Sequence, residues 1–177
     1  MYRKIIPKRA YYSHKQTRNK KPIRSFRDLE IYQKSQQAAV EITRIIQPFL
    51  AEKHYGYEKE FCELTLAIPV QIANAHTQRF EDPLIAMKIL NEVIGSCNRM
   101  MIYLEQIREI YTERTNASEK NNAEVLQDHG ADKDLSSSHQ IFFVCEEMIK
   151  SYNTIRIKTL NLLKAWKKFY QVDEESR

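Results

Sequence analysis

Glycine and proline are scarce in this chain, which has three glycines and five prolines among 177 residues. An all-β fold needs many tight turns, and these two residues build most of them, so their scarcity argues against that class. The chain also lacks an apolar run near the roughly 20 residues that cross a bilayer, and its first residues do not form a signal peptide. We therefore expect a soluble, cytoplasmic protein made of long helices, with no membrane partner.

Residues in the patterns of familiar catalytic and metal sites are also missing. There is no GxxxxGK[ST] or GxGxxG loop, no HExxH helix and no nucleophile elbow. The three cysteines, Cys62, Cys97 and Cys145, are far apart within apolar helical patterns, so we interpret them as buried reduced thiols. Glu60 and Glu63 lie one helical turn apart, but the Glu-x-x-His repeats of di-iron bundles are absent. The sequence therefore predicts no enzyme, no catalytic residue, no metal and no cofactor.

Positive charge is concentrated at the start of the sequence. The chain has 28 Lys or Arg and 23 Asp or Glu, but residues 1–24 hold nine of the bases and no acid. These bases are Arg3, Lys4, Lys8, Arg9, Lys15, Arg18, Lys20, Lys21 and Arg24. Tyrosines lie between them, and Pro7 and Pro22 disfavour a helix, so we expect a flexible basic arm that neutralises phosphates and stacks on unpaired bases. A solvated leader without a partner is the alternative.

Two helices are predicted after the arm. Ser25-x-x-Asp28 has the spacing of a capping box before an apolar period, which predicts a first helix from Phe26 to about Leu50. Pro48 and then residues 54–56 mark its end and the turn that follows. A second helix spans residues 61–80 and has Pro69 in its middle. An isolated helix would break at this proline, so we expect neighbouring helices to pack around it. Two short helices with a turn at Pro69 are the alternative.

A third helix follows, with Asp82 as its cap and Pro83 in its first turn, and its apolar stripe continues to Tyr111. Gly95 lies inside this helix, where we interpret it as a point of close approach to another backbone. Residues 112–137 have few apolar side chains and more acids than bases, so we predict a disordered acidic insert there.

The last helix is predicted over residues 138–170, with Ser138 as a cap and residues 171–177 as a tail. Its apolar seam repeats at alternating steps of four and three, the spacing of left-handed bundle packing. The seam consists of Ile141, Cys145, Met148, Tyr152, Ile155, Thr159, Leu162, Trp166 and Phe169. The fold class predicted is all-α: an antiparallel up-down four-helix bundle with a disordered arm and a long disordered loop between helices 3 and 4.

The last helix carries two further features. Beside the seam lies a second apolar band, formed by Phe142, Ile149, Leu160 and Leu163. This band predicts an interface with another copy or another protein, or else simply a wider core face. The helix is also basic, and four of its lysines add to the predicted nucleic-acid-binding set: Lys150, Lys164, Lys167 and Lys168.

Two stretches of the sequence resemble a known family. SFRDLEIYQKSQQAAVEI in the first helix matches F-R-D-L-x-x-x-Q through Phe26, Arg27, Asp28, Leu29 and Gln33. LAIPVQIANAHTQRF in the second matches I-P-x-x-I-A through Ile68, Pro69, Ile72 and Ala73. Residues 25–111 thereby resemble the 23S rRNA intervening-sequence protein family, which includes the accessory variability determinants of diversity-generating retroelements. The family often continues with Glu-Gly, where this chain has Asn74.

The resemblance implies an up-down bundle that assembles as a homopentamer with a basic surface. It also implies a non-catalytic partner of a retroelement reverse transcriptase that binds template RNA or an RNA–DNA hybrid. We expect this function first. A structural or protein-interaction bundle of the rRNA intervening-sequence type, with no nucleic-acid role, is the second hypothesis. An enzyme, for example a metal-dependent one, is the third.

Overall fold

A computed structural model describes residues 23–121 and 131–170 of the chain, and the side chains of residues 23–111 and 140–170. The predicted arm up to residue 22, residues 122–130 of the predicted insert and the tail at 171–177 lie outside the described residues. The described chain is all-α, as predicted, and contains no strand in either of its two ranges. No helix in these ranges is long and apolar enough to cross a membrane.

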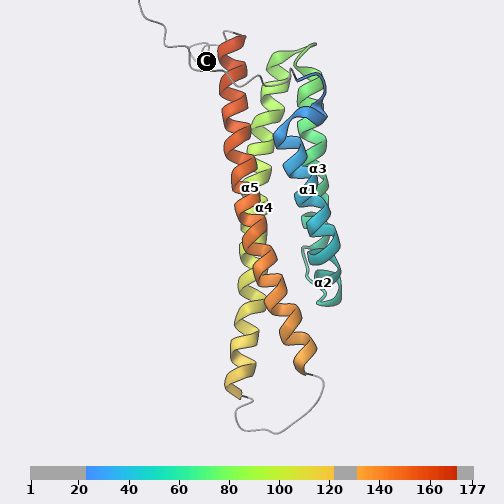
Figure 1. Cartoon of the computed structure of the whole chain (residues 1–177), viewed down its shortest axis with the longest axis vertical. Helices are drawn as coiled ribbons and strands as arrows, with labels where there is room; N and C mark the ends of the chain where they lie inside the picture. Colours follow the sequence, from blue (N-terminus) through green and yellow to red (C-terminus); the bar gives the residue numbers. More distant parts are fainter. Residues whose placement is uncertain (1–22, 122–130, 171–177) are drawn as a thin grey trace, which may run out of the picture.

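The described chain forms a bundle of long helices (Figure 1). In chain order the elements are η1 (Phe26–Asp28), α1 (Glu30–Glu41), η2 (Ile42–Ile46), α2 (Gln47–Glu52), α3 (Glu58–Gln78), α4 (Pro83–Asn121) and α5 (Ala131–Phe169). α4 packs against both α3 and α5, and α1 packs against α3 and α5. Figure 1 shows that each long helix runs opposite to the one before it, and that α4 and α5 extend beyond α2.

The predicted capping box forms, but it caps a shorter element than expected. Ser25 Oγ accepts a hydrogen bond from the backbone N–H of Arg27 at 3.3 Å, and Asp28 Oδ2 accepts one from Ser25 N–H at 2.9 Å. These bonds close the single 3₁₀ turn η1. Leu29 then adopts an extended conformation, so α1 begins only at the residue after it. Leu29 is buried, which anchors this step against the core.

Pro48 does not end the first helical segment, which continues to Glu52. A proline has no N–H to donate and crowds the carbonyl four residues before it. The π-turn η2 immediately precedes it, and there Gln47 N–H bonds to the carbonyl of Ile42, five residues back. This wider turn shifts the hydrogen-bond pattern just before the proline, so the helix can pass it.

α3 is one unbroken helix through Pro69, which confirms the first interpretation and excludes two short helices. Pro69 is itself buried, and Phe61, Ile68 and Ile72 are fully inaccessible on the face toward the core. α1 and α4 both pack against α3. Packing on both sides therefore holds the two halves of the helix together where the proline removes a hydrogen bond.

The interpretation of Gly95 is wrong. Gly95 lies on an exposed side of α4, and a Cβ atom built there would meet no neighbouring atom within 4 Å. The buried face of α4 runs instead through Leu90, Cys97 and Leu104. No backbone crosses the helix at Gly95 within the described chain, so a small residue is not required there.

Replacing Gly95 by Ala is expected to raise the free energy of unfolding by about 1 kcal/mol, because alanine loses less backbone entropy in a helix. Urea unfolding of the two proteins measures the difference. Light scattering on the same samples provides the control, since the mass in solution is expected to stay unchanged. A loss of stability or of mass in the alanine variant would show that another backbone does approach α4 at this residue.

Most of the predicted seam on α5 is buried. Ile141, Cys145, Tyr152, Ile155, Thr159 and Trp166 are inaccessible or nearly so, and Met148 and Leu162 are half-buried. Phe169 is the exception, because 78% of it is exposed. Burial raises the pKa of both Cys97 and Cys145 to about 12, and both are free cysteines, as predicted.

The prediction of a disordered insert at 112–137 is wrong at both of its ends. Residues 112–121 continue α4, and α5 begins at Ala131, so Ser138 lies inside the helix and does not cap it. Neither helical piece contains a glycine or a proline. No helix-breaking residue therefore interrupts either piece, and both helices continue beyond the ends of their apolar stripes, where the pattern predicted a stop.

Candidate nucleic-acid interface

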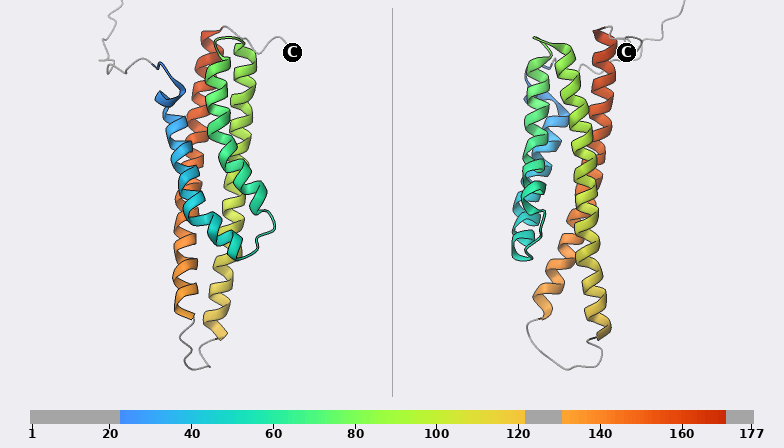
Figure 2. Two further views of the ribbon diagram at one scale, coloured as in Figure 1. Left: turned by 90° about the vertical axis from the view of Figure 1, so that its right-hand side faces the viewer. Right: turned by 180° about the vertical axis from the view of Figure 1, so that it is seen from behind.

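Three parts of the chain meet at one end of the bundle, which we call the arm end. They are residues 23–28, the turn at residues 79–82 between α3 and α4, and the last two turns of α5 (Figure 2). The hydroxyl of Tyr170 donates a hydrogen bond to the carbonyl of Arg79 at 3.1 Å, which links α5 to the turn. Because the described chain starts here, residues 1–22 are attached to the bundle at this end.

A small core of its own supports the arm end. Its buried members are Ala75, Ala86, Met87, Leu90, Leu163 and Trp166. They come from α3, α4 and α5, so this cluster fixes the three helices relative to one another below the turn. The side chains at the arm end are therefore held on rigid elements.

Arg79 contacts both a buried ring of this core and an exposed ring at the surface. Its guanidinium carbon lies 4.4 Å from the ring centre of Phe80 and 5.6 Å from that of Trp166. Trp166 is buried, whereas 70% of Phe80 is exposed. Aromatic faces attract a guanidinium group, so these contacts fix the positive charge beside an exposed ring.

Two large aromatic rings are open to solvent at the arm end. Phe169 is 78% exposed and packs edge to face against Tyr170, with ring centres 4.9 Å apart. Phe80 is the other, on the α3–α4 turn. Every nucleobase has a face that can stack on an exposed ring of this kind.

Six bases and three acids belong to the parts of the chain that form the arm end. The bases are Arg24, Arg27, Arg79, Lys164, Lys167 and Lys168, and the acids are Asp28, Glu81 and Asp82. Asp28 accepts hydrogen bonds from two backbone N–H groups, those of Ser25 and Arg24, and these bonds lower its pKa. Asp82 caps α4 by accepting from the N–H groups of Leu84 and Ile85, as predicted. Two of the acids at this end are therefore committed to the backbone.

His76 lies beneath Phe80 and adds no charge near neutral pH. Only 5% of it is exposed, and its ring meets the ring of Phe80 edge to face at 5.7 Å. Burial lowers the pKa of His76, the charge of Arg79 lowers it further, and Asp28 opposes both effects. A neutral imidazole therefore supports the exposed ring from below.

The structure brings together part of the predicted nucleic-acid-binding set. Arg24, Lys164, Lys167 and Lys168 all lie at the arm end. Lys150 does not, because it lies 14 residues before Lys164 on α5, a rise of about 21 Å. It forms an ion pair with Glu147 at 2.9 Å, and both side chains are well exposed. The other predicted bases, Arg3, Lys4, Lys8, Arg9, Lys15, Arg18, Lys20 and Lys21, lie outside the described residues.

Sequence reasoning missed Arg27, Arg79 and Phe80 as site residues, and it placed Phe169 in the core. The available signal was the Arg79-Phe80 pair in a short turn before the cap of the next helix. A residue in a short surface turn need not pack against a core, so an aromatic residue there is a candidate for binding.

The second apolar band on α5 divides between core and surface. Leu163 is 3% exposed and belongs to the core at the arm end, which corrects its assignment to an interface. Ile149 is half-buried against the main core. Leu160 is 38% exposed, and Phe142 is half-buried with its ring 5.6 Å from that of Phe143. For Leu163 and Ile149 the band is therefore a wider core face.

Glu60 and Glu63 do not approach other metal-binding groups. Both are exposed, and Glu63 lies 4.0 Å from the ammonium of Lys59. Within the described residues, no three His, Cys, Asp or Glu side chains come together as a metal site would require. The arm end therefore remains the candidate site.

Comparison of the chain with models of protein families, with curated proteins and with solved structures gives no match. The resemblance to the 23S rRNA intervening-sequence family rests on the residues of η1, α1 and α3 quoted above, together with Leu29.

Proposed function

We propose that this protein is a non-catalytic nucleic-acid-binding accessory protein, and that its arm end and residues 1–24 together hold RNA or an RNA–DNA hybrid. One observation carries the proposal: the rings of Phe80 and Phe169 are largely exposed at the end where a nine-base arm joins the bundle. Lysine and arginine neutralise phosphates, and exposed rings stack on unpaired bases. The combination suits a strand with unpaired bases better than a regular duplex.

The sequence pattern and composition support two finer parts of the proposal, an antiparallel up-down four-helix bundle and a cytoplasmic location. The family resemblance supports the other two, assembly as a homopentamer and partnership with a retroelement reverse transcriptase. A protein of this kind would position the template without taking part in the chemistry.

Replacing Phe80 and Phe169 together by Ala is expected to weaken binding of a single-stranded RNA 12-mer by at least about 30-fold, because two stacking rings are lost. Stacking of one base on one ring contributes about 1–3 kcal/mol. Fluorescence anisotropy with a labelled oligonucleotide measures the affinity.

Phe143→Ala provides the matched control, because Phe143 is 67% exposed on α5 but far from the arm end. It is expected to bind RNA as the parent does. An equal effect of the two changes, or no binding by the parent at low salt, would contradict the proposal.

A protein-interaction bundle is the second candidate. Leu66 and Val70 favour it, because they lie one turn apart on α3 and are 59% and 57% exposed. Unchanged RNA binding in the Phe80 and Phe169 variant would shift the balance toward this candidate.

A further inference from the structure

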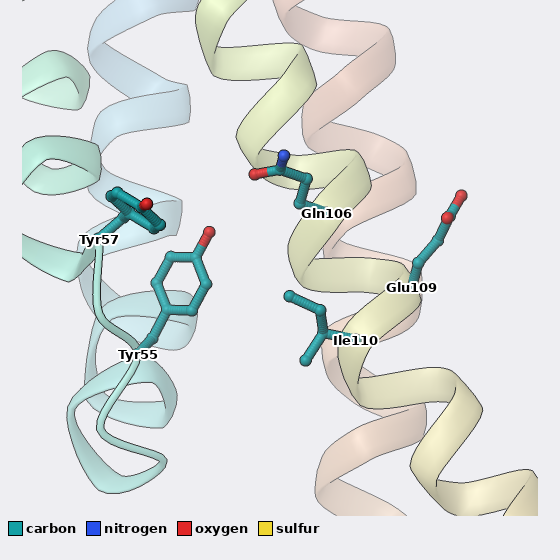
Figure 3. A pocket seen from close by; sticks show the side chains of 5 residues that line it. All are labelled: Tyr55, Tyr57, Gln106, Glu109 and Ile110. Atoms are coloured by element: carbon teal, nitrogen blue, oxygen red, sulfur yellow. The ribbon is translucent and has the colours of Figure 1, made fainter.

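A groove of about 420 Å³ lies far from the arm end, between the α2–α3 turn and the middle of α4. Tyr55, Tyr57, Gln106, Glu109 and Ile110 line it, and we call it the tyrosine groove. Figure 3 shows Gln106 and Ile110 on α4 facing the two tyrosine rings across the groove, with Glu109 at the rim and pointing away from the rings. None of these residues belongs to the arm end.

Two aromatic rings line one side of the tyrosine groove. The centres of Tyr55 and Tyr57 are 6.0 Å apart with their planes at 65°, and the ring centre of Tyr103 is 6.4 Å from that of Tyr57. Tyr57 is 59% exposed, so a ligand can reach its face. Burial raises the pKa of Tyr55, and the neighbouring tyrosines raise it further, so its phenol stays neutral. Neutral aromatic faces arranged in this way attract a guanidinium or ammonium group.

The charges beside the groove favour a cation and disfavour a nucleic acid. Glu109 lines the groove. In the sequence, Glu58 is the neighbour of Tyr57 and Glu105 is the neighbour of Gln106. Arg108 is the adjacent base, but it forms ion pairs with both Glu146 and Glu109. Arg108 is thus shared between two carboxylates, so Glu109 and Glu146 together keep a net negative charge beside the groove. A phosphate backbone would be repelled here, whereas a lysine or arginine side chain would be attracted.

The chain itself supplies a suitable cationic segment. Residues 1–22 contain eight Lys or Arg and no acid, and they join the bundle at Ile23. The helical path from Glu30 to Glu52 is 23 residues, or about 35 Å, and it leads from the arm end toward the groove. Twenty-two extended residues reach about 73 Å. The arm is therefore long enough to reach the groove of its own chain, with slack to pass around the helices.

We propose that the tyrosine groove is an intramolecular docking site for the basic arm, in which a lysine or arginine of residues 1–22 lies against Tyr55 and Tyr57. While the arm is docked there, its lysines and arginines are not available to bind another anion. Docking therefore regulates how much of the arm is free to bind a polyanion, and a strong polyanion displaces the arm from the groove.

Photocrosslinking of the full chain tests the contact. A p-benzoylphenylalanine residue replaces Tyr57 in one protein and Leu66 in the control, since both native side chains are 59% exposed. Mass spectrometry of the monomer band is expected to map crosslinks from position 57, but not from position 66, to residues 1–22. Crosslinks from position 57 that are absent, that map only to the helices, or that appear only in a band of twice the mass would overturn intramolecular docking.

Trypsin provides a second measurement, because it cleaves after the lysines and arginines of the arm. In the full chain, Tyr57→Ala is expected to speed cleavage of the arm about fivefold, because it removes one cation–π contact that holds the arm in the groove. Leu66→Ala is expected to leave the rate as in the parent. Equal rates for all three proteins would overturn the proposal. Neither experiment contains a nucleic acid, so their outcome is independent of the proposed function.

Discussion

Replacing Leu163 by Lys is expected to lower the free energy of unfolding by about 3–5 kcal/mol. Leu163 is only 3% exposed, and it packs with Trp166 in the small core that fixes α3, α4 and α5 at the arm end. Lysine would lose this packing and place a charge where the described core offers no carboxylate partner. Urea denaturation followed by circular dichroism measures the change.

Leu160→Lys is the matched control for that prediction. It introduces the same charge on the same helix three residues earlier, but Leu160 is 38% exposed. Its effect on the free energy of unfolding is expected to stay within about 0.5 kcal/mol, as for most surface substitutions. Similar effects of the two changes would contradict the assignment of Leu163 to the core. A stable Leu160→Lys protein that loses mass in solution would instead reveal an interface around Leu160.

The sequence allowed most of the helical fold to be predicted, because apolar period and caps are local signals. Asp82 and Pro83 correctly placed the start of α4, and the stripe around Pro69 correctly required a single packed helix. The ends of α4 and α5 were wrong because we took the loss of an apolar stripe as the end of a helix. A helix needs such a stripe only where a neighbour packs against it.

The candidate site was predicted only in part, because its decisive contacts join residues that are distant in the sequence. Arg79 meets Trp166 across 87 positions, and no local pattern encodes that contact. Phe169 follows the seam period but lies at the last residue of α5, where it remains 78% exposed. Periodicity gives the face on which a residue lies, but not whether a neighbouring helix reaches that level.

Raising the salt concentration from 50 to 200 mM is expected to weaken RNA binding by about 10³-fold. Each base that neutralises a phosphate releases a counterion, so the logarithm of affinity falls linearly with the logarithm of salt, by about 0.7 for each contact with a single strand. A slope near −5 or −6 requires about eight contacts. The nine bases of residues 1–24, with Lys164, Lys167 and Lys168, can supply them. Anisotropy titrations over a series of salt concentrations measure the slope.

Two variants separate the charge of the arm from the stacking of the rings. Replacing Lys15, Arg18, Lys20 and Lys21 by Ser is expected to make the slope shallower by about 0.7 for each lost contact. Replacing Phe80 and Phe169 by Ala is expected to lower the affinity at every salt concentration and to leave the slope unchanged, because stacking releases no counterions. An unchanged slope in the serine variant would show that the arm does not contact phosphates. Binding would then have to come from the bases of the folded arm end, and its slope could not exceed what those few residues provide.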